Sequence, residues 1–402
     1  MKIRRRAYSH IQINGALMPD FRALLSGRIA MEPCTLINFL CPVSGREILL
    51  RQDDVNVLSR LPAGWIDRPS LDPSTFKSEH LDTLLERTLL LSDDPADTSS
   101  AAILLAEERA ETIGWHPLTR LHHGMTRWSG VMGEEGARAH DVDSERERLI
   151  SHVARHGPIP EHFPVHPACV DSIPLPRGTL LSNKGDPFVS LLHQRRTTRH
   201  FDVNRPVKLA ALADALHLTF GALGVETLAP GMVAVKRTSP SGGALHPLQA
   251  YPLIVDVESL TPGFYHYRGH DHVLELIKPM DKEQARTLAN QLVAGQDYFA
   301  DAAALVFHVA RLDRQFWKYR MHPKAMRVLL LDSGHLSQTF YLVAARLGLG
   351  AYYTAAINDA DIETILCLDA SARMVIGANG IGSIDSSRDQ LHMRPIPLPE
   401  PG

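Results

Sequence analysis

A run of prolines between residues 157 and 187 constrains the folding of this chain more than any other feature of its sequence. The prolines stand at positions 158, 160, 164, 167, 174, 176 and 187. Proline cannot continue a helix or donate a hydrogen bond within a central strand. The stretch is therefore expected to be extended, as a connector that leads into a second domain.

The length of the chain agrees with this division. At roughly 100–200 residues per domain, a chain of 402 residues is expected to form two domains, or three with a small one. We expect an N-terminal domain over residues 1–95, a helical and Pro-rich connector over 96–186, and a larger domain over 187–402. The content of 44% hydrophobic and 22% charged residues is that of a soluble globular protein.

Charge, hydropathy and cysteine content exclude several classes of protein. The net charge is −3, which argues against a nucleic-acid partner bound by electrostatics. No window approaches 18 apolar residues, and no apolar segment follows the basic start, so we expect neither a membrane span nor a secretory signal. The 4 cysteines and 21 histidines show no metal-ligand spacing, so we expect no bound metal and no disulfide scaffold. A cytoplasmic enzyme is the resulting expectation.

The N-terminal domain combines a strand with two helices. The sequence predicts a short strand over 46–50, a capped helix over 53–61, and a second helix over 78–90 with a stripe of leucines. This order is typical of a winged-helix-like module. The start of the second helix is acidic rather than basic, unlike a helix that reads DNA. Peptide or protein docking and a purely structural role both remain open.

The larger domain alternates helices and strands, which predicts an α+β fold with a mixed sheet flanked by helices. The expected helices cover 207–220, 281–294 and 323–347. The expected strands cover 249–257, 263–267, 273–277, 303–310 and 372–378, with the second and third forming a hairpin.

Two stretches of the larger domain are suited to binding a ligand. The loop from Lys236 to Pro247 has two adjacent glycines whose amides can approach a ligand, with serines and a histidine around them. The stretch from Leu192 to Phe201 gathers three arginines and two threonines, which suit a phosphate. Each stretch taken alone also fits an ordinary surface loop.

Together with a third stretch, they resemble one known family. Arg195-Arg-Thr-Thr-Arg199-x-Phe201 resembles the entry motif of the nitroreductase fold. Arg237-x-x-Pro-Ser-Gly-Gly-Ala-Leu-His-Pro247 resembles the signature of its SagB-type branch, the peptide azoline dehydrogenases. Lys318-Tyr319 and the later Leu330-Leu-Asp-Ser-Gly-His335 resemble a Lys-Tyr pair and a Leu-Glu-Ala-Gly-His helix of that branch. The resemblance covers residues 187–382.

The resemblance implies a homodimer that binds FMN. Contacts with the flavin phosphate and ribityl chain are implied for Arg195, Arg196, Thr197 and Arg199. Contacts with the partner's flavin are implied for Pro240, Ser241, Gly242, Gly243 and His246. The backbone of Thr354, Ala355 and Ala356 is implied to face flavin N5. The chain departs from the pattern at Ala244 and Arg320, and only Arg388 and Arg394 are candidates for a C-terminal phosphate contact.

The resemblance also implies that Lys318 and Tyr319 are catalytic. Oxidation of an azoline to an azole removes a proton from one carbon and a hydride from its neighbour. A flavin accepts the hydride, whereas the proton needs a base, and Lys318 supplies one if burial lowers its pKa. A surface lysine is the alternative.

Three functions are therefore weighed. The first is an FMN-dependent dehydrogenase that oxidises a ribosomally synthesised precursor peptide, with a cyclodehydratase complex as a candidate partner. The second is an NAD(P)H-dependent nitro or quinone reductase, and the third is a peptide-docking scaffold subunit. The glycines from 377 to 382 follow the spacing Gly-x-x-Gly-x-Gly, which does not match the dinucleotide fingerprint.

Overall fold

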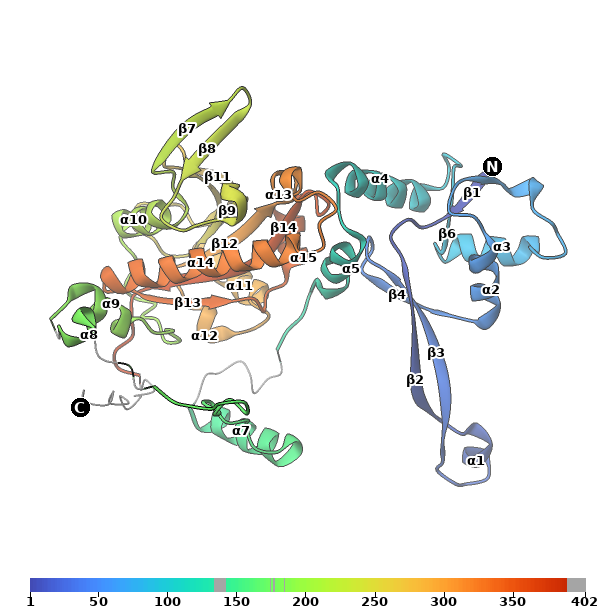
Figure 1. Cartoon of the computed structure of the whole chain (residues 1–402), viewed down its shortest axis with the longest axis horizontal. Helices are drawn as coiled ribbons and strands as arrows, with labels where there is room; N and C mark the ends of the chain where they lie inside the picture. The colour runs from blue at the N-terminus through green and yellow to red at the C-terminus, as the bar shows by residue number, and fades with distance from the viewer. Residues whose placement is uncertain (134–141, 174, 176–177, 184, 389–402) are drawn as a thin grey trace. The chain divides into compact units, whose positions relative to one another are not determined.

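The computed structural model describes residues 1–133, 142–173, 175, 178–183 and 185–388 (Figure 1). The chain forms two compact units. The N-terminal unit comprises residues 1–127, 311–328 and 368–374. The second, which we call the sheet unit, comprises 128–310, 329–367 and 375–402. The domain limits expected from the sequence, at 95 and 186, stay predictions.

The sheet unit is built on six strands in the order β11-β10-β9-β12-β14-β13. β11 pairs antiparallel with β10, β10 with β9, β9 with β12, and β13 with β14. The strands are β9 (Leu248–Ile254), β10 (Gly263–Arg268), β11 (Val273–Pro279), β12 (Ala304–Arg311), β13 (Gly350–Thr354) and β14 (Arg373–Gly382). The predicted hairpin and the three other predicted strands are confirmed within a few residues, and β13 was not foreseen.

Helices accompany this sheet. They are α7 (Val142–His156), α8 (Thr179–Ser182), α9 (Pro187–Gln194), α10 (Leu209–Phe220), α11 (Lys282–Leu292), α12 (Asp297–Ala300), α14 (Ala325–Arg346) and α15 (Asp359–Ile365). A separate exposed hairpin consists of β7 (Gly224–Ala229) and β8 (Met232–Lys236). The three helices predicted for this part of the chain are confirmed. The Pro-rich stretch contains no helix or strand over residues 157–173, but the short helix α8 lies within it and α9 begins at its last proline, Pro187, so the stretch is not extended throughout.

A buried polar network joins the centre of the sheet to α14. His308 of β12 is fully buried, with Nδ1 2.8 Å from the Ser333 hydroxyl and Nε2 3.0 Å from Asn379 Oδ1. The Ser333 hydroxyl also lies 2.8 Å from the Tyr353 hydroxyl. The Asn379 amide donates to the Tyr352 carbonyl at 2.9 Å. Because buried polar groups must find partners, this network fixes the position of α14 on the sheet.

The glycines from 377 to 382 have a packing role. They lie within β14, where a Cβ on Gly377, Gly380 or Gly382 would clash with the rings of Tyr353, Tyr352 or Phe201 respectively. Their spacing therefore reflects aromatic side chains that lie against the strand, which agrees with the absence of a dinucleotide fingerprint in the sequence.

The N-terminal unit contains two three-stranded sheets, ordered β5-β1-β6 and β2-β3-β4. The strands are β1 (Lys2–Arg5), β2 (His10–Pro19), β3 (Met31–Cys41), β4 (Arg46–Leu50), β5 (Ile66–Asp67) and β6 (Leu90–Ser92). The helices are α1 (Phe21–Leu25), α2 (Gln52–Arg60), α3 (Ser78–Glu86), α4 (Thr98–Ile113), α5 (Pro117–Thr126) and α13 (Leu312–Lys318). Leucines and isoleucines from both sheets, α2 and α3 form its core.

One predicted helix of this unit was too long. The sequence predicted a helix over 78–90, but α3 ends at Glu86 and Leu90 lies in β6, opposite Arg5 of β1. Thr88 has a φ of 54°, a left-handed conformation that interrupts the helix. The leucine stripe therefore continues into the core through a strand rather than through another helical turn.

Candidate functional site

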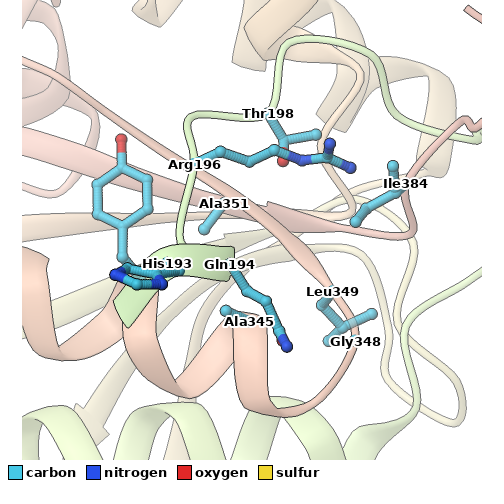
Figure 2. A pocket seen from close by; sticks show the side chains of 10 residues that line it. His193, Gln194, Arg196, Thr198, Ala345, Gly348, Leu349, Ala351 and Ile384 are labelled. Atoms are coloured by element: carbon cyan, nitrogen blue, oxygen red, sulfur yellow. The ribbon is translucent and has the colours of Figure 1, made fainter. Parts of the chain in front are cut away.

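A pocket of about 460 Å³ lies in the sheet unit (Figure 2). Its walls come from four parts of the chain: the end of α9 with the segment that follows it, α14 with the residues just past it, β13, and the segment after β14. The lining residues are His193, Gln194, Arg196, Thr198, Tyr341, Ala345, Gly348, Leu349, Ala351 and Ile384. The first predicted motif therefore lies at this pocket.

The chain reaches the pocket through a short helix and an extended segment. Asp186 caps the start of α9, and the residue after that helix, Arg195, is already extended. The Thr198 amide then donates to the Ala351 carbonyl of β13 at 2.8 Å. Gly350 allows this close approach because a Cβ there would lie 2.6 Å from the Thr198 side chain. The arginine segment is thus tied to the start of β13.

Tyr341 of α14 organises the first motif. Its hydroxyl lies 3.2 Å from the Thr197 hydroxyl, and its ring centroid lies 5.4 Å from the Arg195 guanidinium carbon. Such a cation–ring distance is favourable. Ala345 stands one helical turn after Tyr341 and leaves space for the pocket, so α14 supplies one wall and one anchor.

The electrostatics of this pocket suit an anion. Arg196 lines the pocket and is exposed, and Arg199 is exposed nearby in sequence. Neither arginine, nor Arg195, forms an ion pair with another residue that the structure describes. A guanidinium group without a carboxylate partner beside a pocket is available for bidentate contact with a phosphate. The residues present therefore fit the phosphate end of FMN.

The second motif is held against the first half of α14. The Ser241 hydroxyl donates to Asp332 Oδ2 at 2.5 Å, and the Gly242 amide donates to Asp332 Oδ1 at 3.0 Å. The His246 amide in turn donates to the Ser241 hydroxyl at 3.0 Å. The Asp332 carboxylate is buried and therefore needs hydrogen-bond donors. The Ser241 hydroxyl and the Gly242 amide, both from one loop, supply them.

This loop has an uncommon backbone. Gly243, Ala244 and His246 have φ values of 65°, 55° and 46°, in the left-handed region that only glycine adopts freely. Pro240 is exposed, whereas His246 is half-buried. The contacts to Asp332 hold the loop in a conformation that a free chain would rarely adopt. Asp332 was part of a quoted motif but received no role in the sequence prediction.

The segment Thr354–Ala356, whose backbone is implied to face flavin N5, lies at the end of β13. Thr354 is buried, and its hydroxyl accepts the Ala356 amide at 3.1 Å. The Gln296 side chain donates to the Ala356 carbonyl at 2.9 Å. Ala355 is exposed between them. At ~3.4 Å per strand residue, Thr354 lies about 10 Å along β13 from Ala351 of the pocket.

Lys318 and Tyr319 lie in the N-terminal unit, at the end of α13. Lys318 is exposed, with Nζ 6.0 Å from the centroid of the half-buried Tyr319 ring. Phe316, two residues earlier, is fully buried and lies edge-on to Trp115 at 5.0 Å. The use of Lys318 as a base was predicted on condition that its side chain is buried. The N-terminal unit does not bury it.

Several residues of the pocket escaped the sequence prediction. Tyr341 and Ala345 continue the spacing of four residues from Ser337, so helical periodicity could have identified them. Thr198 lay within the first motif but received no assignment. Arg388 lies 3.5 Å from Asp385 in an ion pair, and Arg394 lies outside the described residues.

The part of the chain that the structure describes contains no group of three or more His, Cys, Asp or Glu residues that could hold a metal ion. No helix found there is both long enough and apolar enough to span a membrane.

Comparisons with known proteins identify the class. The model of the nitroreductase family matches residues 192–383. A Methanocaldococcus jannaschii protein, named as a candidate nitroreductase, is 32% identical over a region that covers 44% of this chain and 82% of the relative's length. The chain belongs to the nitroreductase family, and its sheet unit has the nitroreductase-like arrangement of mixed helices and strands.

Two further relatives belong to the peptide-processing branch that the sequence motifs resemble. The trifolitoxin-processing protein TfxB of Rhizobium leguminosarum is 30% identical over 34% of this chain and 36% of its own. The microcin B17-processing protein McbC of Escherichia coli is 27% identical over 35% of this chain and 52% of its own. The chain thus spans about a third to a half of the length of these two relatives.

Proposed function

We propose that the protein is an FMN-dependent dehydrogenase that oxidises an azoline of a ribosomally synthesised peptide to an azole. The observation that carries the proposal is the arginine-bearing pocket at the first motif, in a chain similar to two proteins that process peptide toxins. Membership of the nitroreductase family supports oxidoreductase chemistry, and similarity to these two relatives supports a peptide substrate.

The described residues can hold FMN along β13. Arg196 and Thr198 would bind the phosphate, with Arg195 and Thr197 held in place by Tyr341. The segment Thr354–Ala356, about 10 Å along the strand, would face the ring system with its backbone. When bound, FMN would accept the hydride that leaves the azoline carbon. The loop held by Asp332 would complete the site of a second subunit in a homodimer.

The proton from the neighbouring carbon needs a separate acceptor. We assign this role to Lys318, with Tyr319 as an assisting hydroxyl. Because Lys318 is exposed at the end of α13, the bound peptide itself must cover this side chain and exclude water from it before it can act as a base. The predicted winged-helix-like module in the N-terminal unit would bind a more distant part of the precursor peptide and supply affinity rather than chemistry.

The experiment that tests this function compares three variants on a synthetic peptide that carries one thiazoline. Loss of two hydrogens is followed by mass spectrometry. Lys318→Ala should retain FMN and reduce turnover by a factor on the order of 10²–10⁴. Tyr319→Phe should reduce it less, and Lys324→Ala serves as the control because Lys324 is another exposed lysine nearby in sequence. Unchanged turnover in Lys318→Ala would contradict the assignment of the base.

The reductase remains the second candidate because the M. jannaschii relative is named as a candidate nitroreductase and matches over most of its length. NAD(P)H oxidation in the presence of a nitroarene or quinone distinguishes the two functions. Rapid reduction of these compounds without oxidation of the thiazoline peptide would favour the reductase. If the protein binds the peptide, leaves it unchanged and takes up no FMN, the scaffold function is favoured.

A further inference from the structure

The outer part of the β2–β3 ribbon lacks cover. Strand β4 pairs with β3 over Ile37–Cys41, so the described ribbon beyond Ile37 consists of β2 and β3 alone. Helix α1 closes its far end (Figure 1). We call residues 10–36 the arm. A hairpin of two strands without a third strand or a packed helix is at best marginally stable in water.

One face of the arm is apolar and continues the core of its unit. The register places Ile11 opposite Phe39, Ile13 opposite Ile37 and Leu17 opposite Pro33, and residues opposite each other share a face. Phe39 belongs to the buried core and is 4% exposed. Farther out on the same face, Ile13 is 68% exposed and Leu17 65% exposed. Exposed apolar side chains therefore extend from the core along this face, with Gly15 opposite Thr35 between Ile13 and Leu17.

Along most of its length the free edge of β2 lacks the usual protection, and its only proline is Pro19 at the end of the strand. Edge strands are normally blocked by charged residues, prolines or bulges. From His10 to Met18, β2 contains no Asp, Glu, Lys, Arg or Pro. Its ten pairs with β3 run from His10–Leu40 to Pro19–Met31 in unbroken register. The strand thus presents a long, regular and uncharged edge that is ready to pair.

We propose that this edge pairs with β2 of a second copy of the same chain, which gives the outer part of the arm a third strand. Two observations favour a second copy over a peptide substrate. The arm needs permanent cover because it is marginal alone, whereas a substrate leaves after each turnover. Pairing about a twofold axis brings a strand against itself, which a charged strand would resist and the uncharged β2 permits.

This self-association is independent of the proposed function. It uses the N-terminal unit and requires neither FMN nor a peptide. The homodimer expected from the family involves the second motif and α14 of the sheet unit. Loss of pairing at β2 and loss of the homodimer interface at the second motif and α14 are therefore separate outcomes. A measurement that reports on each strand and helix distinguishes them.

The test is amide hydrogen exchange of the full-length protein, followed by mass spectrometry across a range of protein concentrations. Amides of β2 should be protected at high concentration and exposed on dilution. Ile13→Lys places two like charges close together at the proposed interface and should weaken self-association about tenfold or more. Leu105→Lys is the control, because Leu105 of α4 is 49% exposed and lies outside the arm.

Exchange in α2 and α3 of the same samples shows whether the N-terminal unit of each variant remains folded. Protection of β2 that is lost in Ile13→Lys and retained in Leu105→Lys supports the proposal. Concentration-independent exchange of β2 in the unaltered protein would overturn it. Protection that appears only when a precursor-type peptide is added would overturn it in favour of peptide docking. Loss of FMN binding with normal β2 protection would refute the proposed function and leave this inference intact.

Discussion

Strands β12 and β2 have similar lengths but opposite surroundings. Every residue of β12 except its last, Arg311, is buried. No residue of β2 reaches that degree of burial, although it contains two isoleucines and a leucine. β12 is therefore a complete part of a core, whereas β2 leaves apolar side chains exposed to solvent. A strand of the first kind positions a site, and a strand of the second kind marks a surface for association.

The polar contacts of β12 show how it positions the site. His308 reaches α14 through Ser333, and the neighbouring Asp332 holds the Ser241–Gly242 turn. Farther along the same helix, Tyr341 contacts the arginine segment. One buried histidine thus supports a helix whose two halves hold the two predicted flavin motifs.

The largest expected effect tests the contrast between the two strands directly. Phe307→Ala in β12 removes a fully buried ring and should lower the free energy of unfolding by about 3–5 kcal/mol. Leu17→Ala on the arm, measured below the concentration of self-association, should change it by less than about 0.5 kcal/mol. Urea unfolding measures both. Equal losses would mean that the arm is covered within a single chain.

The second effect concerns pH. Burial lowers the pKa of His308 to about 4, whereas the unfolded chain titrates near ~6.5. Between these values the unfolded state binds a proton that the folded state does not, so stability falls as pH decreases from about 6.5 to 4. The total loss should approach about 3 kcal/mol.

Urea midpoints at several pH values measure this loss. His308→Gln should flatten the dependence, and His270→Gln should leave it unchanged because His270 is exposed on the same unit. Burial also lowers the pKa of His123 in the N-terminal unit, so exchange of β12 amides is the readout that isolates the sheet unit. An identical pH dependence in His308→Gln would contradict the account.

The third effect concerns the pocket. Arg196→Ala removes a charged bidentate donor and should weaken FMN binding by roughly 1.5–3 kcal/mol. Fluorescence titration with FMN measures the change. Arg155→Ala is the control, since Arg155 is an exposed arginine in α7. Equal FMN affinity in both variants would place the phosphate elsewhere.

The smallest effect concerns the contact between Thr197 and Tyr341. Thr197→Val keeps the shape of the side chain and removes the hydroxyl, so FMN affinity should fall by about 0.5–1.5 kcal/mol. Tyr341→Phe should produce a similar decrease because it removes the other hydroxyl of the same pair. A double variant that loses no more than either single variant would confirm that the two act together.

Much of the sheet unit could be predicted from the sequence because its elements follow simple rules. The α14 helix has a proline shortly before it and Gly348 after it, and the hairpin of β10 and β11 alternates apolar and polar residues. Arg196 of the first motif lines a pocket, and ligand binding by this motif stays a prediction. The roles of the individual site residues stay predictions.

The missed features depend on contacts between distant residues. Asp332 acquires a role only because the loop at Ser241 folds back against α14. The arm was missed although Ile11, Ile13 and the absence of charge in β2 gave a period-two signal. Local propensity also favoured helix through Leu90, whereas pairing with Arg5 places this residue in a strand.

The central claim is that the sheet unit binds FMN at the pocket beside Arg196. The visible absorption spectrum of the purified full-length protein, recorded during titration with FMN, tests it most directly. We expect a protein-bound flavin band that saturates at one FMN per chain and is weakened in Arg196→Ala. A colourless protein that takes up no FMN at any concentration would contradict the claim.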